Sequence, residues 1–223
     1  MIYAFDLVMF DLDGTLIETA PEICDAVNDT LARFDLPAVG QQQVDDWIGH
    51  GTRELLISAL ADAGKTDVAA IRASDSLTLI AAEFDKHYQR RCGTRSHLYP
   101  QVRETLTTLR ARGVKLAVVT NKEGRYTAAV LDAHQLTPLF DRVVSGDTLA
   151  RKKPDPMGIH SCLTEFKTPV HRALFVGDSS IDVATARNAG VQVWALPYGY
   201  NMGQPIARSE PDRLIANCSD LLS

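Results

Sequence analysis

Four aspartates stand in two short segments, each directly behind an apolar run. Asp11 and Asp13 lie near the N-terminal end of the sequence, and Asp178 and Asp182 lie near its C-terminal end. If the two apolar runs are strands of one parallel sheet, the carboxylates gather beyond the carboxyl ends of those strands, where the ligand sites of open α/β sheets lie. Four carboxylates this close would repel one another strongly unless a cation joined them.

The donor atoms available at this edge of the sheet are all oxygens, because no cysteine or histidine stands at a matching strand end. Oxygen donors imply a hard cation. Mg²⁺ is the natural choice, because it keeps part of its water and shares its coordination shell with a phosphate. Such an ion would offset the charge of a phosphate and let a carboxylate attack phosphorus. The residues therefore indicate phosphate chemistry with Mg²⁺ as cofactor.

Two further segments bring polar side chains to the same edge. Thr120 and Asn121 follow another apolar run and offer neutral hydrogen-bond donors. Lys153, which directly precedes Pro154, offers a second positive charge to hold a nucleophile and phosphoryl oxygens together, whereas Lys152 is expected at the surface. As structural alternatives, the Asp-Xaa-Asp segment could form only a turn, and the Thr-Asn pair could only cap a helix.

Short apolar runs are the expected strands that position these side chains. The runs are Leu7–Phe10, Leu116–Val119, Val143–Val144, Ala173–Val176 and Val191–Ala195. Between them lie helical patterns, at Val102–Leu109 with Gly113 behind it as the residue that ends the helix, and at 123–134, 156–166 and 181–189. Strands that alternate with helices predict right-handed βα units and a doubly wound parallel sheet, so the fold class is α/β.

The stretch between the first two strands is too long for one crossover. Residues 17–96 show no convincing strand but several helical patterns, of which the clearest runs from Ile23 to Phe34 with Pro21 in its first turn. Other helical patterns lie at about 53–62 and 74–91. We predict an all-helical cap domain over 17–96, inserted into an α/β catalytic core made of 1–16 and 97–223. Its connections, near Leu16–Glu18 and Leu98–Pro100, should act as hinges.

Composition narrows the class of protein. The chain has 223 residues with 23 Lys and Arg against 28 Asp and Glu, so its net charge is −5, which disfavours nucleic acid as a partner. No segment approaches 18 uninterrupted apolar residues, and no secretory signal pattern stands at the start, so neither a membrane span nor export is expected. The four cysteines lie far apart, as in a reduced cytoplasmic protein.

Taken in order, the polar segments resemble the four motifs of the haloacid dehalogenase-like hydrolases. The motifs are Asp11-Leu12-Asp13-Gly14-Thr15, Thr120, Lys153-Pro154 and Gly177-Asp178-Ser179-Ser180-Ile181-Asp182. The resemblance covers essentially the whole chain, including a helical cap after the first motif. Within the family the chain most resembles the phosphoglycolate phosphatases, through Trp47-Ile48-Gly49-His50-Gly51 in the cap and Tyr198-Gly199-Tyr200-Asn201-Met202-Gly203 after the last strand.

This resemblance implies a Mg²⁺-dependent phosphatase that acts on a small phosphorylated metabolite, with 2-phosphoglycolate as the expected substrate. Asp11 would attack phosphorus to form an aspartyl-phosphate, and Asp13 would act as general acid and then general base. Mg²⁺ would bind Asp11, the backbone carbonyl of Asp13 and Asp178, with Asp182 binding directly or through water. Thr120 and Lys153 complete the expected catalytic set.

Three side chains are candidates for binding the substrate. They are Asn121 in the core, and His50 and Arg53 in the cap, which could recognise a carboxylate or hydroxyl of the leaving group. Arg53 also favours an alternative, because sugar-phosphate phosphomutases with similar caps require an arginine there. A pyrophosphatase or nucleotide phosphatase of the same family is a further alternative. A non-catalytic, receiver-like binding module is a remote one, since it needs neither Asp13 nor a closing cap.

Overall fold

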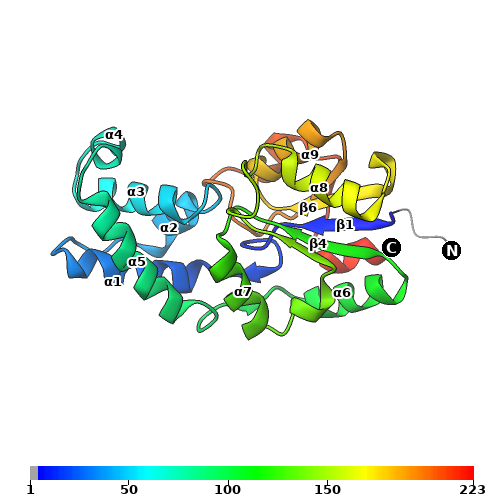
Figure 1. Cartoon of the computed structure of the whole chain (residues 1–223), viewed down its shortest axis with the longest axis horizontal. Coiled ribbons are helices and arrows are strands. Elements are labelled where there is room, and N and C mark those ends of the chain that lie inside the picture. The colour runs from blue at the N-terminus through cyan, green and yellow to red at the C-terminus, as the bar shows by residue number, and fades with distance from the viewer. Residues whose placement is uncertain (1–4) are drawn as a thin grey trace.

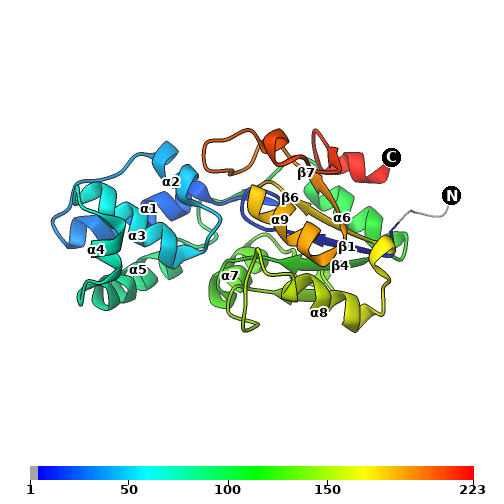
Figure 2. The ribbon, with the colours of Figure 1, turned by 90° about the horizontal axis from the view of Figure 1, so that it is seen from above.

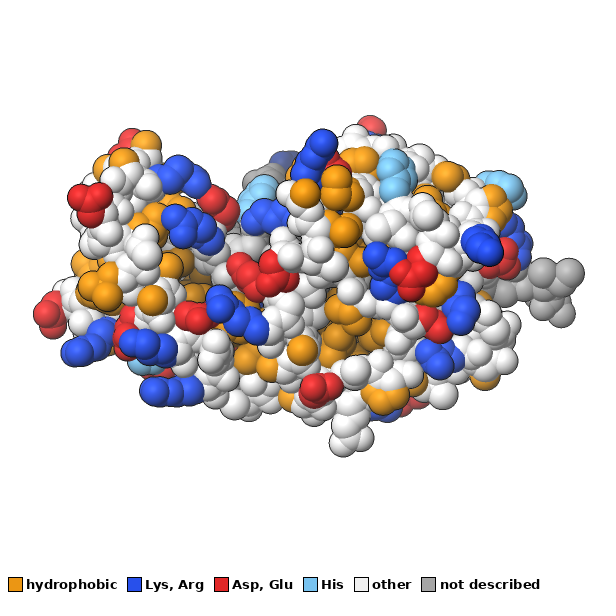
Figure 3. Space-filling model, in the orientation of Figure 1, with side chains coloured by type: hydrophobic (Ala, Val, Ile, Leu, Met, Phe, Trp, Pro, Cys, Tyr) orange, Lys and Arg blue, Asp and Glu red, His pale blue; other side chains and the backbone are white. Residues whose placement is uncertain are grey.

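The computed structural model describes residues 5–223 and divides into two lobes, one of helices alone and one built on a sheet (Figure 1). Residues 1–4, which the predicted core includes, lie outside the described residues. Among the helices that the structure describes, none is long and apolar enough to cross a membrane. Side chains of both charge signs are mixed over the face of the molecule shown in Figure 3.

The larger lobe contains a six-stranded parallel sheet with the strand order β5-β4-β1-β6-β7-β8. The strands are β1 (Leu7–Phe10), β4 (Lys115–Val119), β5 (Arg142–Val144), β6 (Ala173–Gly177), β7 (Gln192–Ala195) and β8 (Arg213–Leu214). The predicted fold class is confirmed, and the five predicted strands are found to within one residue at each end. No apolar run predicts β8, because this two-residue edge strand is exposed.

Helices cover both faces of the sheet. They are α6 (Val102–Ala111) and α7 (Gly124–Ala133) on one face, and α8 (Met157–Phe166) and α9 (Ser180–Ala189) on the other (Figure 2). Because successive strand residues point to opposite faces, Val8 and Phe10 of β1 pack with α6 and α7, whereas Leu7 and Met9 pack with α8 and α9. The central strand is therefore apolar throughout and fully buried.

The smaller lobe consists of five helices around a core of its own. They are α1 (Ala20–Arg33), α2 (Gln41–Trp47), α3 (Thr52–Ala63), α4 (Val68–Arg72) and α5 (Leu77–Arg91). The apolar stripe of α1 is buried against α5 and α3, among other cap residues. No apolar periodicity predicts α2 and α4, because these two short helices bury only one residue between them, Val44.

A short antiparallel ribbon links the two lobes. It pairs β2 (Ile17–Glu18) with β3 (His97–Leu98), so the two connecting segments run side by side. The expectation that no strand lies within 17–96 was therefore wrong at Ile17–Glu18, because two residues are too few to show strand alternation. Short 3₁₀ turns complete the elements, at Thr137–Leu139, Val170–Arg172, Ile206–Ser209 and Cys218–Leu222.

Candidate active site

A pocket lies between the two lobes, beyond the carboxyl ends of β1, β4 and β6. The sheet lobe lines it with polar side chains, and the helical lobe lines it with mostly apolar ones. The residues from the sheet lobe are Asp11, Asp13, Thr120, Asn121, Lys122, Asp178, Ser179 and Tyr200. Those from the helical lobe are Ile23, Ile48, Gly49, Gly51, Thr52 and Leu55. The cavity is small, about 30 Å³.

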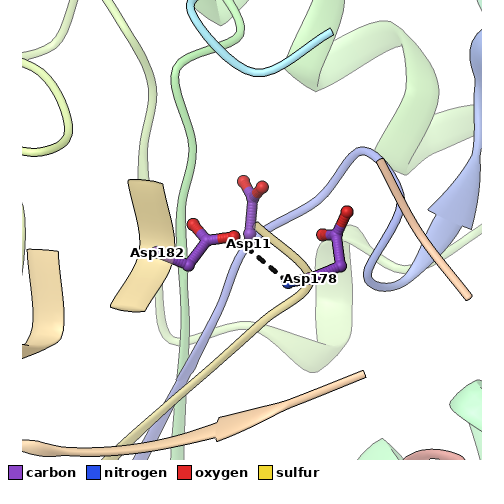
Figure 4. Close-up of side chains that lie close together, drawn as sticks. All are labelled: Asp11, Asp178 and Asp182. Atoms are coloured by element: carbon purple, nitrogen blue, oxygen red, sulfur yellow. Dashed lines mark hydrogen bonds between the residues drawn. The ribbon is translucent and has the colours of Figure 1, made fainter. Parts of the chain in front are cut away.

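Three buried aspartates form an acidic cluster at the base of the pocket. Asp11 follows β1, Asp178 follows β6, and Asp182 stands in the first turn of α9. One carboxylate oxygen of each lies within 4.8 Å of the others, and Figure 4 shows Asp11 between Asp178 and Asp182. The structure brings together three of the four aspartates expected at the strand ends, whereas Asp13 is not part of this cluster. The three carboxylates form the oxygen-only donor set that Mg²⁺ prefers.

Asp182 has hydrogen-bond donors on both carboxylate oxygens. Its Oδ2 accepts from the backbone N–H of Asp178 (3.1 Å), the backbone N–H of Ser179 (3.0 Å) and the Ser179 hydroxyl (2.7 Å). Its Oδ1 accepts from Lys153 Nζ at 2.6 Å. The Ser179 hydroxyl in turn caps the N-terminus of α9. This carboxylate is thus held in one orientation by the start of the helix on which it stands.

Asp178 is held by donors on both sides of its carboxylate. The Thr15 hydroxyl donates to Oδ1, and the backbone N–H of Tyr200 donates to Oδ2 at 2.6 Å. Glycine is required at Gly14 and Gly199, because a Cβ atom at either position would overlap Asp178 Oδ2. The Gly-Thr pair of the first motif therefore shapes the site for an aspartate more than 160 residues away.

Lys153 is the cation inside the acidic cluster. Its side chain is 3% exposed, and its Nζ lies 2.8 Å from Asp11 Oδ1 and 2.6 Å from Asp182 Oδ1. Burial acts to lower the pKa of Lys153, but the two carboxylates outweigh it and raise the pKa above its usual value. Lys152 is exposed, as expected, and its Nζ donates to the backbone oxygen of His50 at 2.6 Å.

One lysine does not offset the charge of three buried carboxylates. Burial raises the pKa of Asp11 to about 6, against the opposing effect of Lys153. Burial also raises the pKa of Asp178 well above its usual value, and the neighbouring carboxylates add to the effect. No described residue donates to the backbone carbonyl oxygen of Asp13 beside them. The site therefore has both the oxygen ligands and the excess negative charge that fit a divalent cation.

Asp13 lies on the side of the pocket nearer to the helical lobe. Its Oδ1 accepts from the Thr19 hydroxyl at 2.6 Å and from Lys122 Nζ at 2.8 Å. No described residue donates to its Oδ2. Lys122 also donates to the Tyr88 hydroxyl on α5. Burial acts to lower the pKa of Lys122, but Asp13 beside it raises the pKa above its usual value.

Thr120 and Asn121 are both buried in the pocket wall after β4. The Thr120 hydroxyl accepts from the backbone N–H of Lys122 at 3.2 Å. The Asn121 side-chain amide donates to the carbonyl oxygens of Gly49 (2.9 Å) and Lys153 (3.1 Å). Asn121 therefore ties a loop of the helical lobe to the segment that carries the buried lysine.

The structure does not bring His50 and Arg53 to the pocket. Both side chains are exposed, and neither is among the residues that line the cavity. The loop that carries them does reach the pocket, but it does so through Gly49, Gly51 and Thr52.

Sequence reasoning missed several residues of the site, above all Lys122, Thr19 and Tyr88. Lys122 directly follows the Thr-Asn pair, so its position at a strand end was a usable signal. Tyr88 gave no signal, because it reads as one more apolar position of α5. Its hydroxyl reaches Lys122 only because the two lobes pack together.

Similarity to known proteins extends over most of the chain. Residues 8–196 match the family model described as haloacid dehalogenase-like hydrolase. A phosphoglycolate phosphatase from Aliivibrio fischeri is 39% identical over 208 residues, which cover 92% of this chain and 90% of that protein. One from Vibrio cholerae is 38% identical over 217 residues, which cover 97% and 95%.

A solved structure is similar over the same extent. The crystal structure of a predicted phosphoglycolate phosphatase from Haemophilus somnus superimposes with a TM-score of 0.92 at 33% identity. The match covers all of this chain and 98% of that one, so it includes both lobes.

Proposed function

The chain belongs to the haloacid dehalogenase-like hydrolases and is a phosphoric monoester hydrolase, and from this premise we propose that it is a Mg²⁺-dependent phosphatase for 2-phosphoglycolate. One observation carries the proposal: Asp11 and Asp13 line the same pocket. Asp11 contacts Lys153 and belongs to the acidic cluster, whereas Asp13 lies on the side of the helical lobe. The names of the similar proteins support the choice of substrate.

Asp11 is the proposed nucleophile. Lys153 lies against its Oδ1, and no described residue donates to its Oδ2, which leaves that oxygen free to attack phosphorus. The attack forms an Asp11–phosphorus bond as the bond from phosphorus to the ester oxygen breaks, so one hydrolysis is divided into two easier steps. The Thr120 hydroxyl in the pocket wall would then contact a phosphoryl oxygen, while Lys153 holds Asp11 in place from behind.

Asp13 is the proposed general acid and base. Thr19 and Lys122 hold its Oδ1, so Oδ2 is the atom that gives a proton to the leaving ester oxygen. In the second step the same oxygen takes a proton from the water that attacks the aspartyl-phosphate. Inorganic phosphate leaves, and Asp11 is restored as a carboxylate.

Three oxygen donors of the site would hold Mg²⁺: the carboxylates of Asp11 and Asp178 and the carbonyl of Asp13. Asp182, whose oxygens already accept four hydrogen bonds, would act through water. When bound, Mg²⁺ supplies positive charge against the phosphate oxygens. The protein's own contribution is to hold Asp178 and Asp182 fixed before any ligand arrives.

The helical lobe, 17–96, is the proposed cap over a catalytic core made of 1–16 and 97–223. The cavity between the lobes is small, about 30 Å³, so we expect the lobes to separate when a phosphomonoester enters. The β2–β3 ribbon is the proposed hinge, because it carries both covalent connections between the lobes. Closure would exclude water from the first step.

Steady-state release of phosphate tests the proposal. The assay compares 2-phosphoglycolate with a sugar phosphate, a nucleotide and pyrophosphate, with Mg²⁺ present. Asp11→Asn should reduce turnover by at least about 10³-fold, whereas Asp75→Asn, which removes an exposed aspartate, should leave it unchanged. Undiminished turnover by Asp11→Asn would contradict the covalent mechanism. A requirement for a sugar bisphosphate activator would indicate a phosphomutase instead.

A further inference from the structure

Lys122 is the only cationic side chain among the described residues that line the pocket. Lys153 lies behind Asp11, in the acidic cluster, and the two candidates of the cap loop, His50 and Arg53, are exposed and do not line the pocket. The rest of the wall near the cap is mostly apolar and includes Ile23, Ile48 and Leu55. A charged group on the leaving side of the substrate would therefore have one side chain to pair with.

The surroundings of Lys122 leave part of its ammonium group unused. The side chain is 1% exposed, and its Nζ donates to Asp13 Oδ1 at 2.8 Å and to the Tyr88 hydroxyl. An ammonium group has three N–H donors. No described residue accepts a third hydrogen bond from it. A buried, rigidly held cation with a spare donor at a pocket wall is suited to bind an anionic group of a ligand.

The neighbouring backbone favours an anion at the same place. Gly51 and Thr52 begin α3 and line the pocket, and no side chain caps this helix. The first N–H groups of a helix carry partial positive charge. The residues at this helix start line the same pocket as Lys122, and no side-chain cap occupies their N–H groups.

We propose that Lys122 is a specificity-determining residue that binds a carboxylate in the leaving group of the substrate. The inference rests on the proposed function and adds the residue that selects the substrate class. Asp13 must contact the ester oxygen, and Lys122 Nζ lies 2.8 Å from Asp13. A carboxylate one carbon from the ester oxygen, as in 2-phosphoglycolate or 2-phospholactate, would therefore stand close to Lys122.

Matched substrates separate this role from the support that Lys122 gives to Asp13. Ethyl phosphate is 2-phosphoglycolate with a methyl group in place of the carboxylate, and isopropyl phosphate has the same relation to 2-phospholactate. Within each pair the chemical step is alike, so the ratio of kcat/KM values reports binding of the carboxylate. The ratio for the unaltered enzyme should be about 100 or more, since a charged hydrogen bond in a buried site has that order of effect.

In Lys122→Met that ratio should fall roughly 10- to 100-fold. Lys122→Arg keeps the charge and should reduce the ratio less than Lys122→Met does. Tyr88→Phe keeps the ammonium group and should leave the ratio nearly unchanged. If Lys122→Met lowers kcat/KM equally for both members of a pair, Lys122 acts only through Asp13 and the inference is overturned. A ratio near one in the unaltered enzyme overturns it without any variant, so the test does not depend on folding of the variants.

The two proposals fail in different ways. If 2-phospholactate is hydrolysed and 2-phosphoglycolate is not, the proposed substrate is wrong. The comparison of 2-phospholactate with isopropyl phosphate then decides whether Lys122 binds a carboxylate. If ethyl phosphate is hydrolysed faster than either carboxylate ester, both the substrate and the inference are wrong.

Discussion

The two walls of the pocket differ in how firmly their side chains are held. On the sheet side, Asp178 and Asp182 have hydrogen-bond donors on every carboxylate oxygen, and Lys153 is fixed between two carboxylates. On the helical side, apolar residues such as Ile23 and Leu55 face the cavity without polar partners. The sheet lobe thus holds its polar side chains in fixed orientations, whereas the helical lobe gives the pocket a mostly apolar wall.

Lys122 and Tyr88 are the exception to this division. The ammonium group belongs to the sheet lobe, but the hydroxyl that helps to hold it belongs to the helical lobe. Aromatic contact between Tyr88 and Tyr126 of α7 joins the lobes at the same place. If Lys122 binds the leaving group as proposed, recognition depends on both lobes, because a hydroxyl of the helical lobe helps to hold the ammonium group.

The largest effect is expected for a substitution of Lys153, the buried lysine on the sheet side of the pocket. Lys153→Met leaves Asp11 and Asp182 buried without their cation, which should destabilise the protein by about 3–5 kcal/mol and reduce kcat by about 10³-fold or more. Thermal unfolding and steady-state kinetics measure the two effects. Lys152→Met is the matched control, because the neighbouring lysine is exposed and should change kcat less than about threefold. Equal losses in both variants would contradict the assigned positions.

Gly199→Ala tests whether the rigid wall positions the metal ligand. The new Cβ would overlap Asp178 Oδ2 and displace that carboxylate. The Mg²⁺ concentration for half-maximal activity should rise about 10- to 100-fold, as for loss of a residue that orients a metal ligand. Gly113→Ala is the control: nothing lies within 4 Å of its new Cβ, although its φ, unlike that of Gly199, is positive. It should cost about 1 kcal/mol of stability and leave the Mg²⁺ requirement unchanged.

Leu55→Ala tests the apolar wall. Leu55 is 3% exposed and faces the pocket from α3, so truncation should cost about 2–4 kcal/mol of stability. It should raise KM several-fold while kcat changes little, because the residue contacts the leaving group rather than phosphorus. A fall in kcat as large as that of Lys153→Met would contradict the assignment of catalysis to the sheet side of the pocket and of shape to the helical side.

The smallest effects are expected for His50→Ala and Arg53→Ala. Both side chains are exposed outside the pocket. Each substitution should change kcat/KM for 2-phosphoglycolate by less than about threefold, the usual range for surface positions away from a site. A loss of 100-fold or more in Arg53→Ala would mean that the cap closes further on substrate and brings this arginine into the site, as the phosphomutase alternative requires.

The sequence by itself determined the sheet, most of the helices and the residues of the acidic cluster. These signals are local: a buried strand is a short apolar run, and the side chains that follow its carboxyl end must lie at one edge of the sheet. Asp11, Thr120, Lys153 and Asp178 could therefore be placed together without knowledge of any contact. Short elements such as α2, α4 and β8 escaped prediction, because they bury too little apolar surface to leave a pattern.

Only the tertiary structure decided which side chains reach the leaving-group side of the pocket. Lys122 lies 109 residues from Asp13 and 34 residues from Tyr88 along the chain. Their contacts depend on how the helical lobe sits on the sheet lobe, and no periodicity encodes that angle. For the same reason His50 and Arg53 had a suitable chemistry and a suitable loop but face solvent. Residue type and strand position determine the acidic cluster, whereas the packing of the two lobes determines which residues line the rest of the pocket.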